Sequence, residues 1–116
     1  MDRKIENKAT VILLEILGIL GVDSLLKVIR EGNEEAELIT DPKEKEKARE
    51  QLGYFMINYL FKNIRAIQPQ LEELIEVLLG KEQKDISILK GIAMLKNDKE
   101  VVSFFTESLG EVMRSV

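Results

Sequence analysis

The stretch from Asp41 to Ile67 constrains the fold most, because the chain's only two prolines lie at its two ends. Asp41-Pro42 is a helix-start signal: an acidic N-cap, then a proline whose missing N–H would have had no partner in the first turn. Pro69 follows just past Ile67. Taken as one helix, the stretch is about 26 residues long and spans roughly 39 Å. The sequence therefore predicts one long central helix between the prolines.

The two halves of this stretch differ in composition. Lys43 to Gln51 alternates basic and acidic residues, which is typical of an exposed helix with ion pairs one turn apart. Leu52 to Ile67 is apolar at adjacent positions as well as at helical spacing. Its hydrophobic arc is wider than the roughly 100° that a surface helix buries. Two interpretations stay open: this helix is the core of its own domain, or a partner protein covers part of it.

Elsewhere the apolar residues recur at the three- and four-residue spacing of a helix, and neither an alternating run nor a hairpin turn indicates a strand. Residues 33–40 either extend a helix or form a loop. With short connections, five or six helices make a compact all-α bundle or array. Start and stop signals predict helices from Ile5 to Gly18–Gly21, from Asp23 or Ser24 to Gly32-Asn33, from Gln68-Pro69 to Gly80, from Asp85 to Leu95, and from Asp98 onward.

At 116 residues the chain can bury one core but not two, so we expect a single helical domain, residues 1–116. With 45% hydrophobic and 33% charged residues, its composition is that of a folded, water-soluble protein. The most apolar run, Ala9 to Val22, contains Glu15 and is shorter than the roughly 20 residues that span a membrane. Basic residues precede this run as in a signal peptide, but acidic residues dilute them and no cleavage site follows. We therefore expect a cytoplasmic protein that enters no membrane.

The residue types disfavour several functional classes. The chain has no histidine and no cysteine, which removes the commonest general base, the commonest metal ligand and all thiol chemistry. The net charge of −4 argues against a nucleic-acid binder, because phosphate binding needs concentrated Lys and Arg. Glutamates at 31–37 and 72–76 lack the histidines of a carboxylate di-metal site in a bundle. Solvated helix faces are the better interpretation, and we expect no metal and no cofactor.

One short motif resembles a catalytic signature. Ser87-Ile88-Leu89-Lys90 matches the S-x-x-K pattern of serine acyl-enzymes, but the companion S-D-N and K-T-G boxes are missing. Ser87 is better interpreted as an early helix residue that follows an Asp85 N-cap. No glycine-rich phosphate loop accompanies it. We therefore do not expect an enzyme.

Apolar surface is the remaining feature that could carry a function. Gly53 lies inside the predicted long helix, where glycine costs about 1 kcal/mol against alanine and is tolerated where another backbone packs close. In the C-terminal helix Phe104 and Phe105 are adjacent and cannot point the same way, so we expect one in the core and one half-buried. Methionine and aromatic residues at an exposed edge suit an adaptable binding surface. The candidate partner contacts are Tyr54, Phe55, Tyr59, Phe61, Phe104, Phe105 and Met113.

The last third of the chain carries a family resemblance. Leu71 to Leu109 reads LEELIEVLLGKEQKDISILKGIAMLKNDKEVVSFFTESL, with a helix start at Asp85-Ile86, a break at Asn97-Asp98 after Leu95-Lys96, and paired phenylalanines. This stretch resembles the small tail assembly chaperones of long-tailed bacteriophages, particularly those of Gram-positive hosts. The GVDSLLKVI segment that follows the first amphipathic helix fits the same pattern more loosely.

The resemblance implies a non-enzymatic role in the bacterial host cytoplasm. Proteins of that family bind the long tape measure protein, keep it soluble, and help to recruit tail-tube subunits; a longer form is often made by ribosomal frameshifting. The family defines no catalytic residues. The alternative hypothesis is a helical adaptor or regulatory protein that homo-oligomerises through Leu52 to Ile67.

Overall fold

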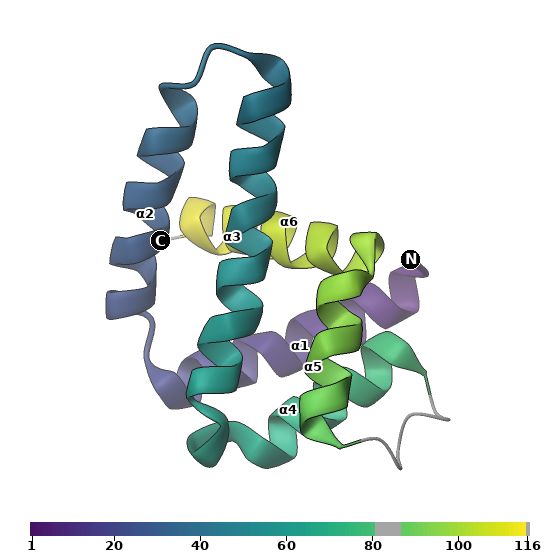
Figure 1. Ribbon diagram of the computed structural model, residues 1–116. Helices are drawn as coiled ribbons and strands as arrows, with labels where there is room; N and C mark the ends of the chain where they lie inside the picture. Colours follow the sequence, from purple (N-terminus) through teal and green to yellow (C-terminus); the bar gives the residue numbers. More distant parts are fainter. Residues whose placement is uncertain (81–86, 116) are drawn as a thin grey trace.

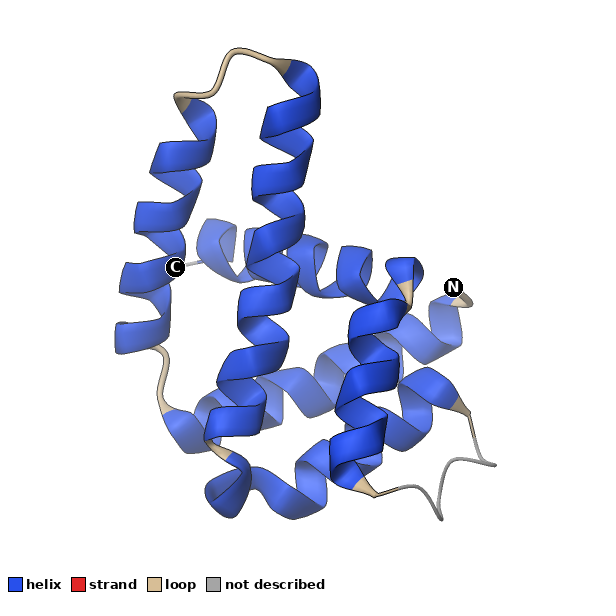
Figure 2. Ribbon diagram, in the orientation of Figure 1, coloured by secondary structure: helices blue, strands red, loops and turns tan. Residues whose placement is uncertain are grey.

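The computed structural model describes residues 1–80 and 87–115, and in that part of the chain it contains six α-helices and no strand (Figures 1 and 2). This confirms the predicted all-α array. Taken singly, none of the described helices combines the length and the apolar character needed to cross a bilayer. The helices are α1 (Arg3–Leu20), α2 (Asp23–Glu37), α3 (Pro42–Lys62), α4 (Ile64–Leu79), α5 (Ile88–Asn97) and α6 (Lys99–Ser115).

The longest helix, α3, is central to the fold. It packs against α6, which crosses behind it, and also contacts α2, α4 and α5, while α1 packs along α4 (Figure 1). The buried side chains of all six helices are apolar, and no polar or charged side chain in the described residues is buried. The most enclosed large side chains are Leu13, Ile16, Leu25, Ile29, Met56, Ile57, Leu60, Ile67, Leu71, Leu74, Leu95 and Phe105.

The α2–α3 hairpin projects from the rest of the molecule, as Figure 1 shows. The molecule measures 43 × 28 × 25 Å, and its radius of gyration is 14.0 Å. A compact domain of this length is expected at about 13.4 Å, so the hairpin makes the molecule slightly elongated. The first half of α3 is solvated, as its charge pattern predicts. Glu37 at the end of α2 pairs with Lys45 (3.2 Å) and Arg49 (3.7 Å) of α3 and ties the hairpin together.

The long helix is shorter than the sequence predicts: α3 ends at Lys62 rather than Ile67. Asn63 leaves the helical conformation (φ −104°, ψ 21°). Its side-chain Nδ2 donates to the Tyr59 carbonyl oxygen (2.8 Å), and its backbone N–H donates to that of Leu60 (3.2 Å). Asparagine thereby satisfies carbonyls that a helix end leaves without partners. The apolar residues around Asn63 obscure this stop signal in the sequence.

The start of α4 agrees with the Gln68-Pro69 signal. The segment from Ile64 is a single turn, and Ile67 breaks it with non-helical angles (φ −129°, ψ 17°). Pro69 cannot donate to the carbonyl of Arg65, four residues earlier, and its ring crowds that group. The regular part of α4 therefore begins next to the proline, as the sequence predicts, and it ends before Gly80.

Two further boundaries differ from prediction. The α2 helix continues through Gly32 and Asn33 to Glu37, although these residues were expected to stop it. Their intrinsic cost is about 1 kcal/mol or less each, which packing of α2 against α3 offsets. Ser87 is not an early helix residue but the N-cap of α5, whose hydroxyl accepts a hydrogen bond from the Lys90 N–H (3.3 Å). The proposed Asp85 cap lies outside the described residues.

The caps at Asp41 and Asp98 form as predicted. The Asp41 carboxylate accepts from the Lys43 N–H (3.0 Å) in front of Pro42. The Asp98 carboxylate accepts from the N–H groups of Glu100 (3.0 Å) and Val101 (3.3 Å). Each cap satisfies donors in the first helical turn, which have no intrahelical partner.

Gly53 marks the place where α3 approaches another backbone, as its position in the helix interior predicts. A Cβ atom there would lie 2.6 Å from the Val102 carbonyl oxygen and 2.7 Å from the Thr106 hydroxyl, both on α6. That hydroxyl lies 3.4 Å from the Arg49 carbonyl oxygen and links the two helices. The close partner of Gly53 is therefore in the same chain, so this glycine is no evidence for an external partner.

Candidate functional site

The aromatic residues of α3 are only partly available at the surface. Tyr54, Phe55 and Tyr59 are half-buried and pack against the core, and the rings of Phe55 and Tyr59 stack with centroids 6.4 Å apart. Phe61 is 40% exposed. Tyr54 also lines a small hollow between α3 and α6 of about 280 Å³, whose described walls carry both signs of charge. Most of the wide apolar arc of α3 is thus covered by its own domain.

The paired phenylalanines of α6 are both buried. Phe104 is 7% exposed and Phe105 is 0% exposed, and their rings meet edge to face with centroids 5.4 Å apart. The prediction of one core and one half-buried ring is therefore wrong. The reason is that α6 is covered on more than one side, by α3 and by α5. Phe105 is a core residue that a partner cannot reach, and the Met113 side chain lies outside the part of the chain that the structure describes.

A groove between α1 and α6 has a floor of apolar side chains. Its volume is about 600 Å³, within the range of ligand-binding clefts. Leu13, Leu17 and the buried Phe104 form its apolar floor. Its other described lining residues are Glu6, Asn7, Thr10, Leu14, Gly18, Val22, Glu107, Ser108 and Glu111.

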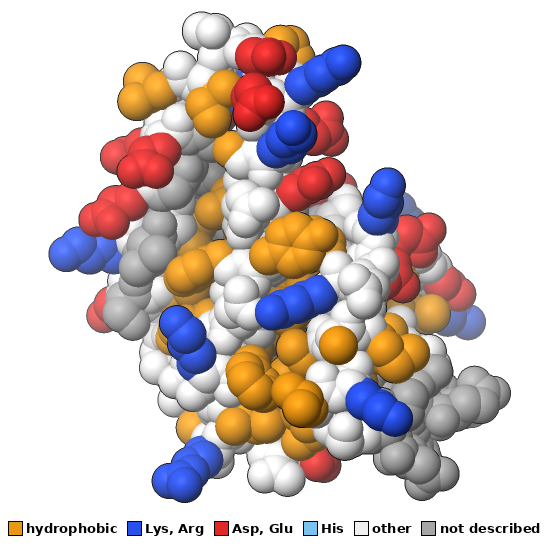
Figure 3. All heavy atoms as spheres, viewed as in Figure 1, with side chains coloured by type: hydrophobic (Ala, Val, Ile, Leu, Met, Phe, Trp, Pro, Cys, Tyr) orange, Lys and Arg blue, Asp and Glu red, His pale blue; other side chains and the backbone are white. Residues whose placement is uncertain are grey.

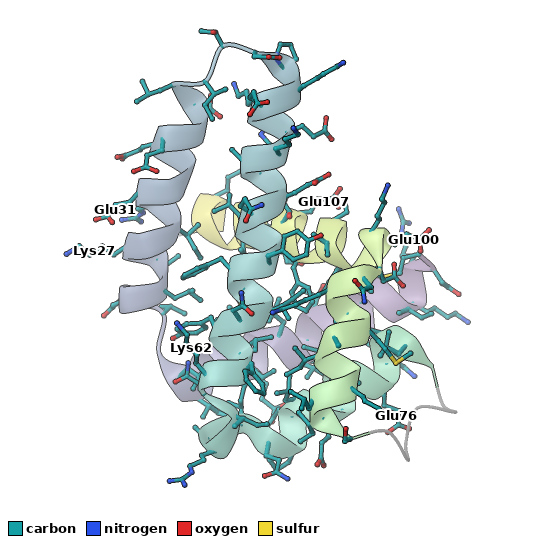
Figure 4. The ribbon with its side chains drawn as sticks, in the orientation of Figure 1. Lys27, Glu31, Lys62, Glu76, Glu100 and Glu107 are labelled. Atoms are coloured by element: carbon teal, nitrogen blue, oxygen red, sulfur yellow. The ribbon has the colours of Figure 1, made fainter. Side chains whose placement is uncertain are left out.

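The groove exists because α1 and α6 pack against different partners. The α1 helix packs on α4, and the α6 helix packs on α3. Neither α1 nor α6 therefore packs closely against the other. Near their starts, the Met1 ammonium nitrogen lies 3.5 Å from a Glu100 carboxylate oxygen. From there the two helices diverge behind α3 and α5 (Figure 1), and Glu100 stands beside the start of α1 (Figure 4).

The α1 wall of the groove presents apolar side chains to solvent. Leu14 is 54% exposed, and Val11, which lies outside the groove lining, is also exposed. Gly18 adds no side chain one turn further on, and no atom lies within 4 Å of the position that its Cβ would occupy. The wall from Glu6 to Gly18 is about 18 Å long. A docked helix of roughly three turns would match that length.

Carboxylates line the groove without a basic counterpart among its described lining residues. Glu6 belongs to α1, and Glu107 and Glu111 belong to α6 (Figure 4 labels Glu107). Glu111 is paired with Arg114 of the same helix (2.6 Å). The Thr10 hydroxyl donates to the Glu6 carbonyl oxygen (2.7 Å). The groove is therefore apolar at its floor and acidic at its edge.

The lining of this groove is suited to binding a partner by burial of apolar surface and by attraction to its carboxylates. Its floor offers aliphatic and aromatic carbon, and its described polar residues are carboxylates, hydroxyls and one amide. In the described residues, no three acidic side chains come together in a group that could hold a metal ion. An apolar groove of helix length accepts the apolar face of an amphipathic helix.

The sequence contains a signal for this groove. Apolar residues of α1 fall at Ala9, Leu13 and Leu17 on the core side, but Val11 and Leu14 lie outside that face. When the apolar residues of a helix cover a wider arc than the helix buries in its own domain, the apolar residues outside the buried arc are exposed to solvent. The sequence-based candidate contacts lie instead in the aromatic clusters of α3 and α6, of which Phe104 and Phe105 are buried, Tyr54, Phe55 and Tyr59 are half-buried and Phe61 is exposed.

No protein-family model, no curated protein and no solved structure matches this chain.

Proposed function

We propose that this chain is a non-enzymatic chaperone of phage tail assembly, which acts in the bacterial cytoplasm and holds an apolar helical segment of a tape measure protein. The observation that carries the proposal is the α1–α6 groove, an open hollow of about 600 Å³ with Leu13, Leu17 and Phe104 at its floor. The resemblance of Leu71 to Leu109 to tail assembly chaperones supports the identity of the client. Tail-tube subunits are the second partner that this resemblance implies.

The groove suits transient binding. A client helix with aliphatic side chains one turn apart would cover Leu14, which is exposed in the free chain. Fully burying one such side chain contributes about 1.5–3 kcal/mol, and lost motional freedom offsets part of that gain. A few such contacts produce a moderate affinity. Moderate affinity lets a chaperone shield an apolar segment and release it when the tail assembles.

The alternative, homo-oligomerisation through the apolar part of α3, has less surface at its disposal. Met56, Ile57 and Leu60 are buried inside the monomer, and Tyr54, Phe55 and Tyr59 are half-buried. Phe61 is the exposed large apolar side chain of that helix in the described residues. We therefore place the client on α1 and α6 rather than on α3.

The test is co-expression of a tape measure protein with the wild-type chain or with either of two matched variants. Leu14→Glu introduces a charge into the groove, and Leu89→Glu introduces the same charge on α5, outside the groove lining. Both leucines are more than half exposed, at 54% and 68%, so both variants should fold. The measurement is the fraction of tape measure protein that stays soluble and co-purifies.

We expect the Leu89→Glu variant to keep the client soluble and the Leu14→Glu variant to lose it. If both variants keep the tape measure protein equally soluble, the client does not bind in the groove. An insoluble client with the wild-type chain would contradict the chaperone function itself. Circular dichroism of each purified variant checks that the helical fold is intact.

A further inference from the structure

The α3 and α5 helices meet along a seam, and residues of α5 border this seam with an apolar strip. The two helices are in contact and run in opposite directions, so the end of α3 lies beside the start of α5 (Figure 1). On α5, Leu89, Ala93 and Lys96 follow one another at helical spacing. They lie outside the side of the helix that Ile92 and Leu95 bury, and Leu89 is 68% exposed. The outer side of α5 therefore carries an apolar strip that ends in a lysine.

A matching strip of α3 borders the seam from the other side. Tyr54, Asn58 and Phe61 follow one another at helical spacing, and Tyr54 lines a hollow together with Lys99, just after the end of α5. This strip of α3 is therefore on the side toward α5. Because the two helices are antiparallel, the exposed Phe61 and Leu89 lie at the same end of the seam. We call the two strips together the α3–α5 face: Tyr54, Asn58, Phe61, Leu89, Ala93 and Lys96.

The charge of the α3–α5 face is basic. Neither residues 52–62 nor residues 88–97 contain an aspartate or a glutamate, whereas they contribute Lys62, Lys90 and Lys96. The chain has a net charge of −4, so without these three lysines the rest of it carries −7. Figure 3 shows Lys and Arg among the hydrophobic side chains that gather over α3 and α5, while most acidic side chains lie toward the hairpin and one edge. The face is thus positively charged on an otherwise acidic protein.

The two ends of the face differ in their charged neighbours. At the Tyr54 end, Glu46 and Glu50 line the adjacent hollow. At the opposite end, Lys62 directly follows the exposed Phe61. A bound segment would therefore place its carboxylates at the Phe61 end and its uncharged part toward Tyr54.

We propose that the α3–α5 face binds an acidic amphipathic helix of a second protein. Apolar side chains of that helix would cover Phe61 and Leu89, and its Asp or Glu residues would approach Lys62, Lys90 and Lys96. Amphipathic helices dock through their apolar side, and complementary charge selects the partner and its orientation. A membrane surface or a long nucleic acid fits less well, because an extended polyanion would also meet the acidic remainder of the chain.

This second site is separate from the α1–α6 groove. None of the residues of the α3–α5 face belongs to the described lining of the groove. The two sites also favour opposite charges in their ligands, because carboxylates edge the groove and lysines edge the face. The proposal for the face goes beyond the proposed function and does not depend on the identity of the client.

Two synthetic peptides test the proposal by fluorescence anisotropy with the full chain. The first is an amphipathic helix of roughly 14 residues, about four turns, with a leucine stripe and glutamates on both sides of it. The second has the same leucines and a glutamine in place of every glutamate. We expect the acidic peptide to bind severalfold more tightly than its uncharged twin. Its binding should weaken severalfold between 0.1 M and 1 M NaCl, because the screening length falls from about 10 Å to about 3 Å.

Two substitutions in the face map the binding site, and each has a matched control. Leu89→Glu is compared with Leu38→Glu, which places the same charge on an 81% exposed leucine at the hairpin end. Lys96→Gln is compared with Lys43→Gln, which removes a lysine from the exposed first turn of α3. We expect Leu89→Glu to raise the dissociation constant of the acidic peptide at least tenfold and Lys96→Gln to raise it severalfold. Both controls should stay within about twofold of the wild type, and circular dichroism confirms that each variant folds.

An acidic peptide without saturable binding at about 1 mM would overturn the proposal. Binding that Leu14→Glu abolishes and Leu89→Glu leaves unchanged would place the peptide in the α1–α6 groove and would also overturn it. A chain that binds phosphatidylglycerol vesicles but not the acidic peptide would assign the face to a membrane instead. The proposed function fails on a different measurement, the solubility of the tape measure protein with the Leu14→Glu variant.

Discussion

Replacing Gly53 by alanine adds one methyl group between α3 and α6. The new Cβ would lie 2.6 Å from the Val102 carbonyl oxygen, 2.7 Å from the Thr106 hydroxyl and 2.9 Å from a Val102 methyl carbon. Ordinary van der Waals contact for such an atom begins near 3.4 Å, so the helices must separate by roughly 0.8 Å at this point. The nearest obstacle is backbone, which cannot rotate away as a side chain can.

The expected loss of stability follows from two opposing terms. Overpacking of this kind costs about 1–3 kcal/mol, and the higher helix propensity of alanine returns about 1 kcal/mol. We expect Gly53→Ala to lower the free energy of unfolding by up to about 2 kcal/mol. For a domain of this size the midpoint of thermal unfolding should fall by up to about 10 °C.

Gly18→Ala is the matched control, because Gly18 is also inside a helix and no atom lies within 4 Å of its added Cβ. Its propensity gain is unopposed, so it should stabilise the chain by about 0.5–1 kcal/mol. Urea unfolding followed by circular dichroism measures the free energy of unfolding of both variants. A shifted midpoint with an unchanged m-value is a change in stability. If Gly53→Ala proves as stabilising as Gly18→Ala, α6 does not pack against Gly53 and the reasoning fails. A Thr106→Ala background should reduce the cost of Gly53→Ala by at least about 0.5 kcal/mol, because it removes one of the atoms in the way.

Three further substitutions test separate parts of the fold. Asp98→Ala should cost about 1 kcal/mol in urea unfolding, because the N–H groups of Glu100 and Val101 lose their acceptor; an unchanged midpoint would contradict the cap. Gly21→Ala should cost about 1–3 kcal/mol, since Gly21 has φ 83° and ψ 151°, a region nearly exclusive to glycine, and a neutral result would refute that conformation. Phe105→Ala should cost about 3–5 kcal/mol, because the ring is 0% exposed; a stable variant that merely loses a partner would place Phe105 at the surface instead.

Local chemistry explains which parts of the fold could be predicted. The caps at Asp41 and Asp98 and the stop at Gly80 depend on residues within one helical turn, and they form where the sequence indicates. Gly53 was also informative, because glycine in a helix interior predicts a close backbone. The stop at Asn63 was missed because an asparagine in an apolar run has no distinctive local pattern. The continuation of α2 depends on packing against α3, which its own residues do not encode.

The groove could not be predicted, for a related reason. The groove exists because α1 packs on α4 and α6 packs on α3. These pairings depend on segments far apart in the sequence and not on the residues of any one helix. The surplus apolar residues Val11 and Leu14 indicate an uncovered face, but not which helix stands opposite. Aromatic clustering pointed to α3 and α6 instead, where Phe105 and most of the apolar arc serve the core.

The central claim is that a client helix lies between α1 and α6. Methyl-resolved NMR of the chain, diluted until monomeric and titrated with a soluble tape measure segment, tests this most directly. The claim predicts that the methyl signals of Leu13, Leu14 and Leu17 shift with client concentration, while the exposed Leu38 at the hairpin end keeps its position. Shifts confined to Leu38 or Leu89, with Leu14 unmoved at saturation, would contradict the claim.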